Sequence, residues 1–535
     1  MTDSRSLLPS RPASRRLVSS ALAALAALAT GVLLAGCTSA VGEQSATSGS
    51  GSQGPVEGGT LRVAATTDHV PASVFGQSSD VGNTLIGLVY DSLVEYPQDS
   101  LDAQPSLATS WEVAEDGRSI TLQLRNDVTF HDGRPFTSED VRFSIETFAD
   151  PAWAVQVQRT AAAVIGFDTS DPHAITLEFA HPLSNILDLL DIVPIVDSES
   201  FPGLKEASTY NGTGPFRFTG WRPGTGMTFE RNEDYWKGAP DLEAVDVSVV
   251  PDAQAQVAGL RSGQYDLALG VTPRDVETLA QDPKFDVHDF EGATQQQYLG
   301  FQLKNRDLQE VRLRQAIAYA VDRERIVEEL YRGSAVASGL PWSPSSPAYD
   351  EEKGQTYARD VAKAQQLVAE LGDVPTLPLQ FAAGQPAGET IAQIVQANLE
   401  EIGLEVELKP TEFAQMYKQL VGAQFEGLWI FGHTYAQYTP ATLTVSAFPF
   451  NAAHNASNFV DEQYRADSDA SWKVADPASA EAEELFDRVN DHIVDNVWLT
   501  DLVTSHPRVV TTSAVHGIDY SKRTELLLDE AWKDQ

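Results

Sequence analysis

The chain has 535 residues with 76 acidic and 37 basic side chains, so its formal net charge at pH 7 is −39. Such an acidic surface lacks the basic groups that bind nucleic-acid phosphates, which excludes nucleic acid as an expected partner. The sequence holds one cysteine, so the folded body forms no internal disulfide, and its length predicts two or more domains with large cores.

The N-terminus combines several arginines with a short apolar stretch from about Ala21 to Leu34. This is the layout of an export signal, and the stretch is too short to span a membrane comfortably. Leu34-Ala35-Gly36-Cys37 resembles a bacterial lipobox. The resemblance implies that residues 1–36 are a signal peptide and that Cys37 is lipidated. Arg15-Arg16 leaves open whether export follows the twin-arginine or the general route.

Residues 37–55 are rich in Ser, Gly, Gln and Glu. A segment of this composition buries too little apolar surface to offset its ordering entropy, so we predict a lipidated, flexible tether. No later apolar run is long enough to span a bilayer. We therefore expect the body to be held by lipid on the outer face of the cell membrane, at the cell surface or in the periplasm.

Strand and helix patterns alternate along the body. Residues 59–65 are typical of a strand, and residues 111–113 and 119–124 of a hairpin around the turn signal Asp116-Gly117. A hydroxyl followed by acidic residues predicts a helix start at Ser138.

The second half of the chain shows helical periodicity in three segments. Residues 307–333 carry apolar side chains at helical spacing and end at Gly333, and residues 358–371 and 388–402 form further amphipathic patterns. Gly403 then leads into a strand at 404–408. This rhythm predicts mixed α/β domains.

Four blocks of sequence resemble the extracytoplasmic solute-binding proteins of ABC importers, family 5, the dipeptide, oligopeptide and nickel class. The first block comprises Pro105 to Glu112, Asp116-Gly117, Leu124 to Gly133 and Thr137 to Val141; the others are Gly212 to Phe218 with Arg231 to Trp236, Ala255 to Asp266, and Val311 to Ile317 with Ala320 to Arg323. The resemblance covers nearly all of the expected mature chain.

The resemblance implies an α/β, two-lobed periplasmic-binding-protein fold of type II, cluster C, with an extra subdomain inserted in the first lobe. Ligand would be held in a cleft between the lobes and would favour their closed arrangement. The expected boundaries are residues 56–95, 212–295 and 505–535 for lobe I, 96–211 for the inserted subdomain, and 296–504 for lobe II.

The signature blocks themselves are interpreted as scaffolding. Phe130-His131-Asp132-Gly133 predicts a tight turn, and Gly212-Thr213-Gly214-Pro215 a close junction between two elements. Asn232 with Tyr235-Trp236 is expected to pack a surface loop.

The sequence contains none of the His-Glu-x-x-His, Gly-x-Ser-x-Gly or Walker motifs, so we expect no enzyme activity and no cofactor. His433 and His454, with His69, could bind a metal ion. Their scattered positions favour ordinary hydrogen-bonding histidines, and we predict no resident metal.

The ligand is expected to meet lobe II around Trp429. The resemblance implies a specific pattern here: in the peptide-binding branches of the family, a Trp is followed within a few residues by an Asp that pairs with the peptide's amino group. Here Gly432 or His433 stands nearest that place. An unpaired buried ammonium would cost several kcal/mol, so this departure favours a capped or modified peptide, a sugar face or an amphipathic metabolite.

Aromatic and amide side chains fill this loop and the expected start of lobe II. The loop after the first strand supplies a further wall. The candidate ligand-binding residues are Trp429, His433, Tyr435, Tyr438, Asn451, Gln297, Tyr298 and Phe75. For Trp429, His433 and Tyr435, a place in the core of lobe II is the alternative to cleft lining.

The leading functional prediction is a monomeric lipoprotein that captures an oligopeptide or modified peptide and delivers it to the permease and ATPase subunits of an ABC transporter. The alternatives are uptake of a sugar-like or opine-like solute, uptake of a metal chelate, and a surface receptor that senses a ligand without transporting it.

Overall fold

The computed structural model describes residues 54–71, 74–75, 80–153, 155–206, 208–292, 294–383 and 385–534. Residues Gly54–Gln535 form one compact unit. The predicted signal peptide (1–36), Cys37 and almost all of the predicted tether (37–55) lie outside the described residues. Within the described part, no helix is long and apolar enough to cross a membrane.

The first large sheet is mixed and draws its strands from both ends of the body. Its order is β12 (Phe285–Asp289), β19 (Arg508–Thr512), β11 (Leu267–Ala268), β1 (Thr60–Ala65), β10 (Ala244–Val249), β9 (Gly226–Arg231) and β8 (Phe216–Arg222). Strand β1 runs parallel to both β10 and β11. Helices α5 (Ala253–Ser262) and α6 (Pro273–Leu279) share one hydrophobic cluster with this sheet, while α1 (Asp80–Val89) belongs to another.

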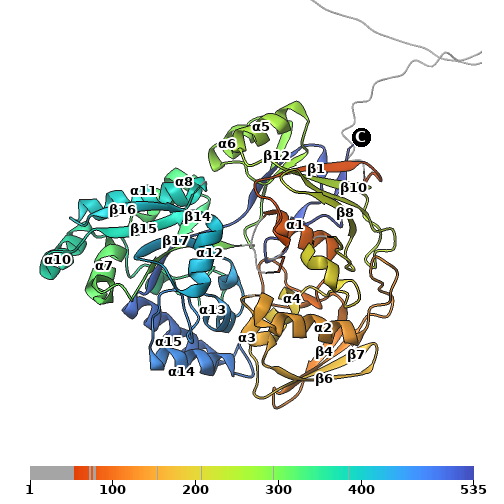
Figure 1. Ribbon diagram of the computed structural model, residues 1–535, viewed down its shortest axis with the longest axis horizontal. Helices are drawn as coiled ribbons and strands as arrows, with labels where there is room; N and C mark the ends of the chain where they lie inside the picture. The colour runs from red at the N-terminus through yellow and green to blue at the C-terminus, as the bar shows by residue number, and fades with distance from the viewer. Residues whose placement is uncertain are drawn as a thin grey trace, which may run out of the picture. The chain divides into compact units, whose positions relative to one another are not determined.

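The second large sheet is built from the middle of the chain and is covered on both faces. Its order is β14 (Ala335–Ala337), β18 (Leu499–Ser505), β13 (Gln295–Phe301), β17 (Leu428–His433), β15 (Leu377–Ala382) and β16 (Val406–Thr411). One face packs against α7 (Val311–Ala320), α8 (Arg323–Tyr331), α10 (Val361–Leu371) and α11 (Pro386–Glu401). The other packs against α12 (Phe413–Gly422), α13 (Pro440–Ser446) and α15 (Ala480–Asn496), with α14 (Glu462–Trp472) beside them (Figure 1).

A smaller antiparallel sheet is formed by the part of the chain between β1 and β8. It has the order β4 (Ala108–Val113), β5 (Ser119–Leu124), β7 (Ala174–Phe179) and β6 (Val164–Asp171). Helices α2 (Ser138–Ala149), α3 (Gln158–Ala161) and α4 (Ile186–Ile192) accompany it. The lobe boundaries given above remain our proposal.

The chain passes between the two large sheets at two adjacent places. It leaves the first sheet after β12 and enters the second at β13, then returns from β18 to β19. Outgoing and returning strands are paired antiparallel on both sides, with Asp289 opposite Arg508 and Gln295 opposite Ser505.

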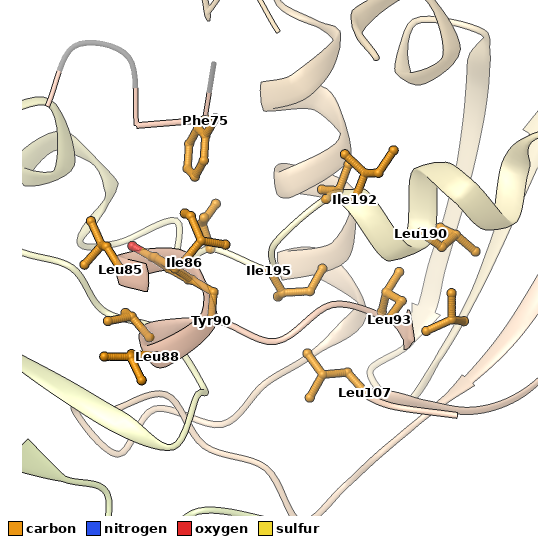
Figure 2. Close-up of a cluster of buried hydrophobic side chains, with 14 of the residues drawn as sticks. Phe75, Leu85, Ile86, Leu88, Tyr90, Leu93, Leu107, Leu190, Ile192 and Ile195 are labelled. Atoms are coloured by element: carbon orange, nitrogen blue, oxygen red, sulfur yellow. The ribbon is translucent and has the colours of Figure 1, made fainter. Parts of the chain in front are cut away.

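One hydrophobic core joins the first sheet to the inserted subdomain. Figure 2 shows part of it: Leu88 lies on one side beside Tyr90, Leu93 and Ile192 lie on the other, and Ile195 lies between them. Side chains of Tyr438, Ala441, Val445 and Trp472, which follow the second sheet's strand β17, belong to the same cluster. The core is therefore shared between the inserted subdomain and α13 and α14.

Several local predictions are confirmed. The Asp116-Gly117 turn connects the antiparallel pair β4 and β5, with Gly117 at φ +66°. Helix α2 begins at Ser138, and its first turn is closed by Asp140, which accepts a hydrogen bond of 2.9 Å from the Thr137 backbone. In the turn at 130–133, Gly133 has φ +91° and its N–H donates to the Phe130 carbonyl.

The continuous helical pattern predicted for 307–333 is wrong in one respect. The segment forms two helices, α7 and α8, because the chain is extended at Val321 and Asp322 starts α8 by accepting a hydrogen bond of 3.0 Å from the Arg325 N–H. The predicted end of the helix is confirmed: Arg332 caps α8 in the left-handed conformation at φ +53°, and Gly333 follows at φ +85°.

The junction Gly212-Thr213-Gly214-Pro215 is tight because α1 ends against it. A Cβ atom on Gly214 would lie 2.6 Å from the carbonyl carbon of Val89 and 2.8 Å from the Tyr90 nitrogen. These neighbours are backbone atoms that cannot move aside. The glycine is therefore required by packing, as predicted.

Replacing Gly214 with Ala should destabilise the fold by about 1–3 kcal/mol, the usual cost of overpacking. Urea unfolding followed by circular dichroism would measure the change. Gly388→Ala is the matched control: this glycine lies in α11 with no atom within 4 Å of an added Cβ, so alanine there should be neutral or stabilising by up to about 1 kcal/mol. An unchanged stability of the Gly214→Ala variant would contradict the packing argument.

Candidate functional site

Polar side chains meet on one face of the second sheet, at the end nearest the two crossings. His433 is the last residue of β17 and pairs with Gln296 near the start of β13. Gln296 also pairs with Thr504 of β18, and Asp501 of β18 lies opposite Tyr298. Since side chains of paired residues project to the same face of a sheet, these groups line one surface.

Buried polar atoms without partners gather at this place. Among the described residues, no hydrogen bond is made by either ring nitrogen of His433, either carboxylate oxygen of Asp501, Oε1 of Gln296, Nε2 of Gln437 or Oγ1 of Thr504. We call Gln296, His433, Gln437, Asp501 and Thr504 the polar cluster. Buried polar groups are nearly always satisfied, so such a group of exceptions needs an explanation.

His433 and Asp501 form the centre of the polar cluster. His433 Nε2 lies 3.5 Å from Asp501 Oδ1, and the two side chains are only 2% and 1% exposed. Burial raises the pKa of Asp501 above its ordinary value, although the nearby His433 and Arg323 act in the opposite direction. The His433 ring packs edge-on against Phe450, with ring centroids 5.1 Å apart. The carboxylate is thus held in a fixed, largely apolar setting.

Two glutamines extend the polar cluster toward the crossing. Gln437 Oε1 accepts a hydrogen bond of 2.8 Å from the Thr294 N–H, which fixes the amide and leaves its Nε2 donor unused within the described residues. Gln296 Nε2 donates to Thr294 Oγ1 at 3.1 Å, which leaves its Oε1 acceptor unused in the same way. The polar cluster therefore offers one amide donor, several acceptors, and the groups of His433 and Thr504, which can do either.

Trp429 lies in the interior of lobe II. Its ring is fully buried and stacks on Phe425 with centroids 4.3 Å apart, and its Nε1 is 3.4 Å from the Tyr298 hydroxyl oxygen. Tyr298 is also fully buried in the same hydrophobic cluster. These contacts favour the core alternative for Trp429. Tyr298 contacts Trp429 on one side and His433 on the other, and its ring centroid lies 5.8 Å from that of His433.

Tyr438 and Tyr435 face the inserted subdomain. The Tyr438 hydroxyl donates a hydrogen bond of 2.8 Å to Asp191 Oδ2, and its ring lies 6.0 Å from that of Tyr96. Tyr435 is partly exposed and packs against the hydrophobic clusters of both large sheets. Both tyrosines thus lie where the lobes meet.

The remaining predicted residues are not brought to the polar cluster by any contact found in the described structure. Asn451 binds backbone groups, with its Nδ2 donating to the Val445 carbonyl at 2.6 Å. Gln297 lies beside Gly432 on the opposite face of β13 from Gln296. Phe75 packs on Phe148 at 5.1 Å within the core of the first sheet. Their assignment to the ligand remains a prediction.

The structure does not assemble the three histidines considered for metal binding. His69 Nε2 pairs with the Tyr210 hydroxyl at 2.5 Å, and burial lowers the pKa of His69 to about 4. No group of three His, Cys, Asp or Glu side chains suited to a metal ion exists in the part of the chain described.

Sequence reasoning missed Asp501 and Thr504, which come from a strand far along the chain. A signal was present: Asp501 is the one charged residue in the run Leu499-Thr500-Asp501-Leu502-Val503. A carboxylate within an apolar strand pattern needs a partner or a function. In space, the carboxylate of Asp501 lies beside His433, the residue that stands where the sequence pattern would have a carboxylate.

Comparisons with known proteins agree on one family. The model of the bacterial extracellular solute-binding proteins, family 5, matches residues 102–454. Heme-binding protein A of Haemophilus influenzae is 29% identical over 363 residues, which cover 62% of this chain and 66% of that protein. Di/tripeptide-binding protein 2 of Pseudomonas aeruginosa is 28% identical over 367 residues, covering 62% of this chain and 68% of that protein.

A solved structure shows the fold. The oligopeptide-binding protein AppA of Bacillus subtilis, in complex with a nonapeptide, superposes with a TM-score of 0.79 at 21% sequence identity, covering 90% of this chain and 100% of that chain. The likeness confirms the predicted two-lobed α/β binding-protein fold. Since the family model spans well over half of the sequence, the chain belongs to the bacterial extracellular solute-binding proteins of family 5.

Proposed function

We propose that the protein is the lipid-anchored receptor of an ABC importer, and that it captures an oligopeptide or modified peptide between its lobes and delivers it to a membrane permease driven by an ATPase. The family and its peptide-binding relatives support the class of solute. Anchoring through Cys37 rests on the resemblance of residues 34–37 to a lipobox.

The observation that carries the proposal is the polar cluster at the crossing end of the second sheet. Its unused atoms are buried, so they need a polar ligand group or ordered water as hydrogen-bond partner. The Asp501 carboxylate suits a ligand cation, because a buried ammonium needs a counter-charge. Its presence supports a peptide with a free amino group as the solute, which the sequence after Trp429 argued against.

A metal chelate is the second candidate. A relative with 29% identity is a heme-binding protein, and the imidazole of His433 is a common metal ligand. The described residues provide no complete metal site, so any metal would arrive with its own ligands. Sugar-like or opine-like solutes and a purely sensing role remain alternatives without a supporting contact.

Asp501→Asn should weaken the binding of the tripeptide trialanine by about 10- to 100-fold, because a hydrogen bond to a charged group contributes about 1.5–3 kcal/mol. Isothermal titration calorimetry would measure the affinity, with N-acetyl-trialanine as the ligand that lacks the cation. Asp495→Asn, an exposed position of the same lobe, is the control. Equal affinity of the Asp501→Asn variant and the unmodified protein for trialanine would refute the assignment.

The same substitution should stabilise the ligand-free protein at neutral pH by about 1–3 kcal/mol, because it removes an unsatisfied buried charge. Burial raises the pKa of Asp501, so the folded state favours the protonated carboxyl. The contribution of Asp501 to folding stability is therefore present in acid and is lost as pH rises. The gap between variant and unmodified protein should therefore widen from about pH 4 to about pH 7. Urea unfolding at both pH values measures it. A variant less stable than the unmodified protein at neutral pH would make Asp501 a structural anchor instead.

A further inference from the structure

A second buried carboxylate lies at the contact between the inserted subdomain and lobe II. Asp188, on α4, is 1% exposed. It accepts hydrogen bonds from the Tyr96 hydroxyl at 2.9 Å, from the N–H and Oγ1 of Thr439, both at 3.1 Å, and from Thr442 Oγ1 at 2.5 Å. Three of these four donors belong to the segment 439–442, at the start of α13.

Neighbouring contacts tie the same two surfaces together. Asp191, almost one turn further along α4, accepts from the Tyr438 hydroxyl at 2.8 Å and from the Tyr96 N–H at 3.0 Å. Asn185 Nδ2 donates to Thr442 Oγ1 at 2.9 Å. A shift of α13 away from α4 would therefore break the hydrogen bonds of Asp188 from Thr439 and Thr442 and that of Asp191 from Tyr438.

The charges around these carboxylates do not neutralise them by direct pairing. Among the described residues, neither Asp188 nor Asp191 has a Lys, Arg or His within 4.0 Å. Tyr96 and Tyr438 are hydrogen-bonded to them directly, and the charged groups that act on them at longer range are Arg523, Lys522 and Glu525. The cations among them belong to the C-terminal segment and stay with lobe I.

Burial therefore controls the protonation of both groups. It raises the pKa of Asp188 to about 6 and that of Asp191 to about 7, against the hydrogen bonds that act in the other direction. Asp191 also borders a pocket of about 310 Å³ that is lined by residues of lobe I and of the inserted subdomain. Asp188, fully enclosed, is the group whose charge depends most on the contact.

We propose that Asp188, assisted by Asp191, is a proton-sensitive clasp that sets how readily lobe II separates from the inserted subdomain. The proposal rests on the proposed function, in which the lobes close around a solute. It adds a regulator of that closure, located outside the polar cluster.

The direction of the effect follows from linkage. Separation exposes the carboxylates to water and returns the pKa of Asp188 toward its ordinary value, so the closed form binds more protons than the open form. Acid therefore favours closure, and closure weakens as pH rises through about 6. The ligand-free receptor should be more open at neutral pH than in mild acid.

Small-angle X-ray scattering of the purified, ligand-free protein would follow the open fraction from about pH 5 to about pH 8, over which one such group should shift the closed-to-open ratio by about tenfold. Asp188→Asn, which mimics the protonated carboxyl, should keep the protein compact across the range. Asp102→Asn, at an exposed position of the same subdomain, should retain the full pH profile. An Asp188→Asn variant with the unmodified protein's profile would overturn the proposal.

A second variant tests the clasp from lobe II and guards against a folding defect at α4. Thr442→Val removes one donor to Asp188 and should enlarge the ligand-free protein most at about pH 8, where the carboxylate is charged. An unchanged radius of gyration would count against the clasp. Addition of trialanine separates the two proposals: compaction on ligand binding without a pH profile would retain the solute receptor and reject the clasp.

Discussion

The two lobes are held in register by the pairing of outgoing and returning chain at the crossings. Asp289 lies opposite Arg508 on one side and Gln295 opposite Ser505 on the other. Asp289 and Arg508 form an ion pair, with His506 Nε2 3.4 Å from the same carboxylate. The two crossings are short and adjacent, which is the arrangement of a hinge between two lobes.

Two buried carboxylates, Asp188 and Asp501, differ in how many hydrogen bonds they accept. At the start of α13, Thr439 and Thr442 donate three hydrogen bonds to Asp188 across the contact between the lobes, and Tyr96 of the inserted subdomain donates a fourth. In the polar cluster, Asp501 has none within the described residues. Donors of the chain itself surround Asp188, whereas Asp501 has only His433 beside it and can accept hydrogen bonds from a ligand. The first group suits control of closure and the second suits recognition.

Local structure was predictable from the sequence because its causes are local. Turns at Gly117 and Gly133, the capped start of α2 and the end of α8 follow from backbone conformation and capping. The break between α7 and α8 was missed because apolar spacing continues across it. The polar cluster could not be predicted from the residues that follow Trp429, because Asp501 lies on β18, which pairs with β13 between it and β17. The register between strands that are distant in sequence cannot be predicted from a single sequence. Trp429 itself, a conspicuous residue, lies in the core.

The position of β19 in the first sheet has a consequence for how the protein is made. Strand β19 lies between β11 and β12, yet it comes from residues 508–512. A ribosome that has released β1, β10, β11 and β12 has delivered a sheet with a gap, which closes only when nearly the whole chain has emerged. Such distant pairing slows folding. The first sheet therefore reaches its final strand order only when translation is almost finished.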